Sequence, residues 1–226
     1  MRHPTRWLLH GGRPGARWLI RRWYDVRVHH PERFPATGPV VVAANHIGVI
    51  DGPLLAIFAP RMVHALTKEE MFEGPLGGLL RVVGQIPLDR LHPDPLAVRT
   101  SLHVLEAGGA IGVFPEGTRG SGELETFRPG AAYLAMVSGA PVVPMVFLGS
   151  REPGGSSGSL PPRGSRIDMV VGRPFEVARH PWPRTVEQVG AMNALLRRHM
   201  RDDLRSALNE TGRTLPGPLP TKDPDD

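Results

Sequence analysis

The chain has 226 residues, 40% of them hydrophobic, which is enough to bury one substantial core in a single domain. Its formal net charge is +5, nearly all of its basic residues are Arg, and such a surface favours anionic partners such as membranes, nucleic acids and phosphorylated metabolites. The sequence holds no cysteine, which excludes a disulfide framework, a thiolate nucleophile and a zinc site with Cys ligands.

Residues 1–24 form a basic amphipathic segment in which Arg alternates with Trp and Leu. This pattern suits a segment that lies in the headgroup layer of an anionic membrane, and it also suits an ordinary amphipathic helix packed on the domain. The apolar patch at residues 7–9 is too short for the core of a signal peptide. We therefore expect a membrane-associating segment without a signal peptide.

Residues 25–210 predict one domain in which strands alternate with helices. Strands are expected at 25–29, 40–44, 62–66, 85–88, 110–114, 142–148 and 165–172. Helices are expected at 54–59, 69–83 in one or two pieces, 95–107, 131–137 and 185–209. This order predicts an α/β fold with a mixed, largely parallel central sheet flanked by helices.

Two further segments decide the membrane and domain interpretation. Residues 130–150 lack charge and are long enough to cross a bilayer, but Pro141 and Pro144 divide them into a buried helix, a turn and a buried strand. We therefore expect no transmembrane span. Residues 211–226 are poor in large apolar side chains, which predicts a disordered tail.

The first candidate site follows the expected strand 40–44, where Asn45 and His46 precede Asp51. The neutral imidazole of His46 can accept a proton from a hydroxyl group, and the Asp51 carboxylate can accept a hydrogen bond from the imidazole. Taken singly, Asp51 also fits a helix N-cap and His46 an ordinary loop histidine. Neither has a second ligand at metal-binding spacing, so we expect no metal ion.

The second candidate site follows the expected strand 110–114, with Glu116, Gly117, Thr118 and Arg119 in sequence. Gly117 permits a close approach of the backbone, and the Arg119 guanidinium can bind a phosphate through two hydrogen bonds. The alternative is a polar turn with a Glu–Arg surface pair. Parallel strands would deliver both candidate sites to one edge of the sheet.

In combination, these segments resemble the glycerophospholipid acyltransferase superfamily, of which the bacterial 1-acylglycerol-3-phosphate acyltransferases are the type. Four blocks of the family occur in order: Asn45-His46 with Asp51, Gly84 with Asp89-Arg90, Phe114 to Arg119, and Pro141 to Pro144. Segments around Lys68 and Phe127-Arg128 also resemble family segments, with Arg128 in place of the usual Lys. Pro87 departs from the aromatic or β-branched residue that is usual there.

The resemblance implies a glycerol-3-phosphate acyltransferase-like fold and transfer of a fatty acyl group from acyl-CoA or acyl-carrier protein to a lysophospholipid. The acceptor it favours is 1-acylglycerol 3-phosphate, with phosphatidic acid as the product and no cofactor. It implies His46 as the base and Asp51 as its partner. The substrate-binding residues it implies are Asn45, Arg90, Glu116, Gly117, Thr118, Arg119 and Arg128. Backbone N–H groups near Gly48 or Gly117 would stabilise the oxyanion.

Other functions stay open at this point. The acceptor can instead be glycerol 3-phosphate, a lyso-glycolipid or a lyso-aminolipid, and a thioesterase would use water in its place. A membrane- or nucleic-acid-binding module driven by Arg is the non-enzymatic alternative, but no nucleic-acid recognition motif occurs and we expect no such partner. We expect a peripheral or monotopic protein at the cytoplasmic face of the cell membrane.

Overall fold

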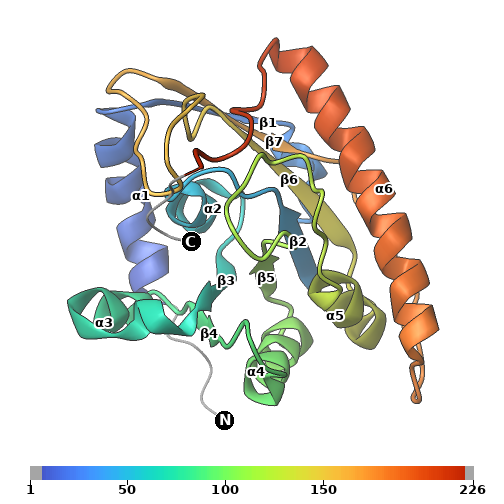
Figure 1. Cartoon of the computed structure of the whole chain (residues 1–226). Coiled ribbons are helices and arrows are strands. Elements are labelled where there is room, and N and C mark those ends of the chain that lie inside the picture. The colour runs from blue at the N-terminus through green and yellow to red at the C-terminus, as the bar shows by residue number, and fades with distance from the viewer. Residues whose placement is uncertain (1–6, 222–226) are drawn as a thin grey trace.

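The computed structural model describes residues 7–221, except for the side chains of residues 7–10. A sheet of seven strands lies at its centre, in the order β1-β7-β6-β2-β5-β3-β4 (Figure 1). The strands are β1 (Asp25–His29), β2 (Val40–Ala44), β3 (Val63–Lys68), β4 (Ile86–Leu88), β5 (Ala110–Val113), β6 (Val142–Leu148) and β7 (Arg166–Val171). Neighbouring strands are parallel except for β6 and β7. The prediction of a mixed, largely parallel sheet is confirmed.

Helices cover both faces of this sheet. They are α1 (Trp7–Arg21), α2 (Asp51–Phe58), α3 (Gly74–Val82), α4 (Pro95–Glu106), α5 (Gly130–Ser138) and α6 (Val186–Thr211), with short 3₁₀ turns at Pro31–Arg33 and Glu69–Phe72. The expected helix 69–83 thus falls into two pieces. Thr185 and Gln188 form a capping box that begins α6, so side chains satisfy backbone N–H groups at its first turn.

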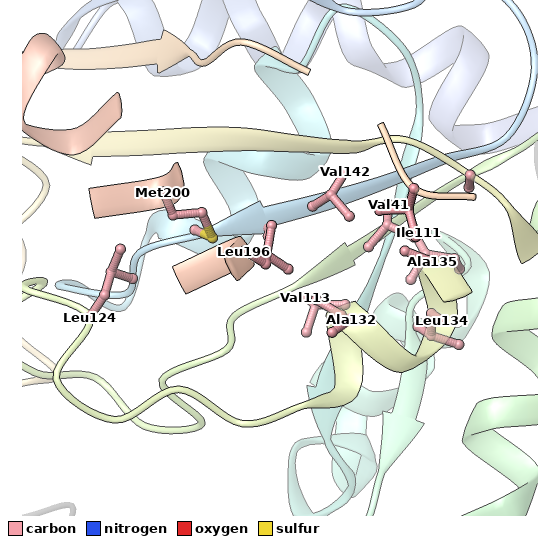
Figure 2. Close-up of a cluster of buried hydrophobic side chains, with 14 of the residues drawn as sticks. Val41, Ile111, Val113, Leu124, Ala132, Leu134, Ala135, Val142, Leu196 and Met200 are labelled. Atoms are coloured by element: carbon pink, nitrogen blue, oxygen red, sulfur yellow. The ribbon is translucent and has the colours of Figure 1, made fainter. Parts of the chain in front are cut away.

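Two apolar clusters lie on opposite faces of β2, whose five residues are all buried. Val41 and Ala43 belong to the cluster that includes residues of α4, α5 and α6, part of which Figure 2 shows. Val40, Val42 and Ala44 belong to the cluster that includes α2 and the Ile20 side chain of α1. Because successive strand residues point to opposite faces, a continuous apolar strand is what a sheet covered on both sides requires.

The two candidate sites meet at one edge of the sheet. β2 and β5 are parallel neighbours, and their register pairs Ala43 with Val113. The chain leaves both strands directly after this pair, so Asn45 and His46 emerge beside Phe114 and the residues that follow it. We call the connection from β5 to α5, residues 114–129, the β5–α5 loop.

Residues 11–21 of the N-terminal segment belong to α1, which packs against α2. The guanidinium groups of Arg13 and Arg17 both donate to the carbonyls of Ile57 and Ala59, at the C-terminal end of α2. These carbonyls lack partners within their helix, so the two arginines satisfy them. Trp18 remains 68% exposed. The helix is therefore docked on the domain with part of its apolar surface exposed, and residues 1–6 lie outside the described residues.

The C-terminal segment, residues 212–221, packs on the domain, which differs from the expected disordered tail. Arg213 forms an ion pair with the buried Asp168, and Leu215 packs against the cluster of α4, α5 and α6. The carbonyl of Gly217 accepts a hydrogen bond of 2.6 Å from Arg151. Specific polar contacts to the domain thus order a segment whose composition is poor in large apolar residues. Residues 222–226 lie outside the described residues.

Candidate active site

The imidazole of His46 and the carboxylate of Asp51 form a hydrogen-bonded pair, with 2.9 Å between Nδ1 and Oδ2. Asp51 begins α2 and is fully buried, while the His46 side chain is 18% exposed. The bond at Nδ1 leaves Nε2 of His46 as the nitrogen that can exchange a proton with a substrate. The structure thus places His46 and Asp51 in direct hydrogen-bond contact.

Other donors fix the Asp51 carboxylate in place. Its Oδ2 also accepts from the backbone N–H groups of Ile47 and Gly48, at 2.7 and 2.8 Å, and its Oδ1 accepts from the Ser150 hydroxyl at 2.5 Å. These bonds hold the carboxylate in one orientation, with Oδ2 toward the imidazole of His46. They also engage the N–H of Gly48, a residue near which we expected an oxyanion donor.

The β5–α5 loop contacts His46 on two sides. The Phe114 ring stacks on the imidazole, with 4.2 Å between ring centroids. The Oε1 atom of Glu116 accepts from the His46 backbone N–H at 2.8 Å, and the His46 carbonyl accepts from Gly120 N–H at 2.9 Å. The structure therefore brings together the two candidate sites that are far apart in sequence.

Burial raises the pKa of Glu116 from 4.5 to about 7, although the hydrogen bond from His46 acts against this shift. Because the folded protein holds this proton more tightly, the contribution of Glu116 to stability is complete below pH 4.5 and is lost as the pH rises to about 7. Glu116→Gln keeps an acceptor for the His46 N–H and removes the titration. Across this pH range, we expect the wild type to lose about 3 kcal/mol of unfolding free energy relative to the variant.

Denaturant unfolding at pH 5 and pH 8 measures this loss. Glu106→Gln, at an exposed position in the last turn of α4, is the control and should retain the wild-type pH dependence. Equal pH dependence in the wild type and in Glu116→Gln would contradict the assignment.

Asn45 has a different role from the substrate binding expected of it. Its side chain is buried and forms two hydrogen bonds with the backbone of Phe147 in β6, accepting at 2.7 Å and donating at 3.0 Å. Both amide atoms are thus occupied. We call the connection from β2 to α2, residues 45–50, the His46 loop. Asn45 links the start of this loop to the neighbouring strand β6, as a further residue of a parallel ladder would.

Gly117, Arg90 and Arg128 form a connected group at the sheet edge. Arg90 donates to the Gly117 carbonyl at 2.7 Å, and Arg128 donates to the Arg90 carbonyl at 3.0 Å. Gly117 has a φ of 77°, a conformation that favours glycine, and a Cβ atom there would lie 2.6 Å from Nε of Arg128, whose flexible side chain would have to shift. Its N–H donates to the Phe114 carbonyl and is also engaged. The guanidinium groups of Arg90 and Arg128 therefore both lie beside Gly117.

Arg119, Thr118 and Lys68 lie farther along the same edge. Thr118 is exposed, and Arg119 is half-buried with its guanidinium 3.5 Å from the Ser157 carbonyl. Lys68 pairs with Glu70 at 3.2 Å on the surface. Of the three, Arg119 combines a charged fork with partial burial, which suits an anionic substrate group.

Sequence reasoning did not identify Ser150 and Arg151, which follow β6. The buried Arg151 guanidinium donates to four carbonyls: Ile47 at 2.7 Å, Gly120 at 2.9 Å, Gly155 at 2.8 Å and Gly217 at 2.6 Å. It therefore joins the His46 loop, the β5–α5 loop and the C-terminal segment. The sequence signal that could have identified Ser150 and Arg151 is their position after a buried strand, which His46 and Glu116 share.

A family model described as Acyltransferase matches residues 25–148, more than half of the chain. The chain belongs to the acyltransferase family. This match confirms the resemblance to the glycerophospholipid acyltransferase superfamily and the expectation of an enzyme that transfers acyl groups.

Individual relatives agree with this assignment. The acyltransferase is 29% identical over 179 residues to a Bacillus subtilis protein named 1-acyl-sn-glycerol-3-phosphate acyltransferase, covering 78% of this chain and 87% of the relative. It is 30% identical over 155 residues to human 1-acyl-sn-glycerol-3-phosphate acyltransferase beta, covering 62% of this chain and 56% of the relative. It thus spans about half the length of the human protein.

A solved structure supports the fold. The crystal structure of the 1-acyl-sn-glycerophosphate (LPA) acyltransferase from Thermotoga maritima matches with a TM-score of 0.66 and 22% identity, covering 91% of this chain and 78% of that chain. The acyltransferase therefore has the fold expected from its motifs.

Among residues 7–221, no group of three or more His, Asp or Glu side chains is placed to hold a metal ion. No helix within the same range is long and apolar enough to cross a bilayer.

Proposed function

We propose that this acyltransferase transfers a fatty acyl group from acyl-CoA or acyl-carrier protein to the free hydroxyl of 1-acylglycerol 3-phosphate, giving phosphatidic acid for phospholipid biosynthesis. The observation that carries the reaction type is the His46–Asp51 pair, which is held rigidly beside a group of arginines. The relatives named 1-acyl-sn-glycerol-3-phosphate acyltransferases support the choice of acceptor.

The reaction needs one base and no covalent acyl-enzyme. Nε2 of His46 takes the proton of the acceptor hydroxyl while its oxygen attacks the thioester carbonyl, and Asp51 stabilises the imidazolium that forms. The tetrahedral intermediate then expels the thiolate, which takes up the proton. The Asp51 carboxylate is held by three further donors, so the imidazole keeps one orientation throughout.

Arg119, Arg90 and Arg128 bind the phosphate of the acceptor in this proposal. Arg90 and Arg128 each donate a hydrogen bond to a backbone carbonyl. A guanidinium group has five N–H donors, so each arginine keeps further N–H groups that can bind an anion. Arg119 extends the charged surface from the same loop. Glu116 and Gly117 shape the acceptor site, and the exposed Thr118 lies between them and Arg119.

Kinetics with varied acceptor test this assignment. Arg119→Ala should raise the KM for lysophosphatidic acid about 10-fold or more while the KM of the acyl donor changes little, since a charge-assisted hydrogen bond to phosphate is lost. Arg99→Ala, an exposed change on α4, is the control and should leave both constants unchanged. Equal increases in both KM values, or turnover of an acceptor without phosphate at the wild-type rate, would contradict the proposed acceptor.

We further propose that residues 1–24 hold the enzyme at the cytoplasmic face of the membrane. Trp18, Leu19 and Trp23 are exposed, and Arg21 and Arg22 flank them on the surface. Amphipathic aromatic side chains beside guanidinium groups suit an anionic headgroup layer, from which a lysophospholipid can reach the site.

A further inference from the structure

A basic groove with a volume of about 480 Å³ runs along α6, outside the residues described above as the active site. We call it the α6 groove. Its lining includes Arg197, Arg198, Arg201 and Arg205, together with Phe127 and Asn193, and it includes no acidic side chain among the described residues. Its volume falls within the usual range for small-molecule sites, and four guanidinium groups select for an anion.

The α6 groove lies against the β5–α5 loop. Arg197 and Arg201 donate to the carbonyls of Leu124 and Glu123, at 2.8 and 3.3 Å. Figure 2 shows Leu124 of this loop and Met200 of α6 in the same buried cluster. Arg128, the residue after Phe127, donates its backbone N–H to the Pro115 carbonyl at 2.7 Å, beside Glu116. The groove and the His46 site therefore share one loop.

Asn193 presents an unused acceptor in this groove. Its side-chain nitrogen donates to the Phe127 carbonyl at 2.9 Å, but its buried Oδ1 has no hydrogen-bond partner among residues 7–221. Buried polar atoms without partners are rare because they forfeit a hydrogen bond to water. A ligand N–H or O–H would satisfy this atom, and the neighbouring Phe127 ring offers a surface for a planar group.

We propose that the α6 groove binds the nucleotide end of acyl-CoA. This inference rests on the proposed function and names the place of the donor. The phosphates of the nucleotide pair with Arg198 and Arg201, while Arg205 pairs with Asp202 on the same helix. The adenine packs on Phe127, and an amino or hydroxyl group of the nucleotide donates to Asn193. The flexible pantetheine arm then carries the thioester along the β5–α5 loop to His46.

Two features favour a nucleotide over other anions. A concave site with a buried acceptor and an aromatic ring suits a small molecule, whereas the carboxylates of a carrier protein would dock on an open surface. The groove also lies away from the surface proposed for the membrane, because α1 and α6 pack against the opposite faces of the sheet (Figure 1). Lipid phosphates at the α1 surface therefore do not reach it.

Binding of adenosine 3′,5′-bisphosphate to the full-length protein, measured by calorimetry, tests the site without any turnover. We expect binding to the wild type and a dissociation constant about 10-fold or more higher for Arg198→Glu, which reverses an exposed charge in the groove. Arg99→Glu makes the same reversal on the exposed surface of α4 and should bind as the wild type does. Absence of binding to the wild type, or equal weakening by both variants, would overturn the proposal.

Donor kinetics give a second readout. Arg198→Glu should raise the KM for palmitoyl-CoA about 10-fold while the kcat/KM for S-palmitoyl-pantetheine, which lacks the nucleotide, stays unchanged. An increase confined to the KM of acyl-carrier protein would assign the groove to an acidic protein, and an increase for lysophosphatidic acid would assign it to the acceptor. Either result overturns the proposal. Nucleotide binding without acyl transfer by the wild type would instead refute the proposed function alone.

Discussion

His46→Ala is expected to lower kcat/KM about 10²–10⁴-fold, because a positioned general base contributes about this factor. The His46 side chain is partly exposed, and the hydrogen bonds of its backbone to Glu116 and Gly120 remain in the variant, so we expect thermal unfolding close to that of the wild type. Steady-state kinetics and calorimetry on the same preparation measure both quantities.

His92→Ala is the matched control for this variant. His92 forms a hydrogen bond with Asp89 through the same pair of atoms, Nδ1 and Oδ2, at 2.8 Å, but its side chain is 76% exposed. Its replacement should leave kcat/KM within about twofold of the wild type, because the Asp89 carboxylate is held by the exposed backbone N–H groups of Leu91 and His92 and the His92 ring faces solvent. A similar loss in both variants would show that His46 does not act as the base.

Arg151→Met is expected to lower both stability and kcat. The buried guanidinium satisfies four backbone carbonyls, and its removal leaves them without these donors, at a cost of about 3–5 kcal/mol. The Ile47 carbonyl is one of the four, so the His46 loop loses a hydrogen bond at the residue next to the base. We expect kcat to fall about 10-fold or more, because small displacements of a base are costly in rate.

Arg61→Met separates positioning from stability. Arg61 likewise donates to three carbonyls, those of Pro35, Gly38 and Gly108, but these precede β2 and β5 at the opposite edge of the sheet. Its loss should destabilise the fold while kcat is retained in the protein that remains folded. If Arg61→Met lowers kcat as much as Arg151→Met, Arg151 acts through general stability and not through the His46 loop.

The fold could be predicted from the sequence because strong local signals and the burial pattern agree. The run of residues 40–44 is apolar throughout, which requires a strand covered on both faces, and β2 is such a strand. The packing of the C-terminal segment on the domain could not be predicted, because it depends on contacts of Arg213 and Gly217 with residues far away in sequence. Composition reports average hydrophobicity and carries no information about such single contacts.

Within the candidate site, side-chain chemistry was easier to predict than the partner of each side chain. The pairing of His46 with Asp51 follows from a short loop between a strand and a helix. Asn45 is adjacent in sequence, yet its amide turns to the backbone of β6, a strand about one hundred residues later. The role of Arg151 likewise depends on where four separate segments meet. Long-range placement of this kind is set by the assembled sheet.

The most direct test of the central claim is to identify the products by mass spectrometry after incubation of an acyl-CoA with and without lysophosphatidic acid. Wild type and His46→Ala are compared at equal concentrations of folded protein. We expect the wild type to release thiol and form phosphatidic acid when the acceptor is present, and His46→Ala to form almost none. Free fatty acid released without acceptor, or equal phosphatidic acid formation by both proteins, would contradict the assignment of His46 as the base of an acyl transfer.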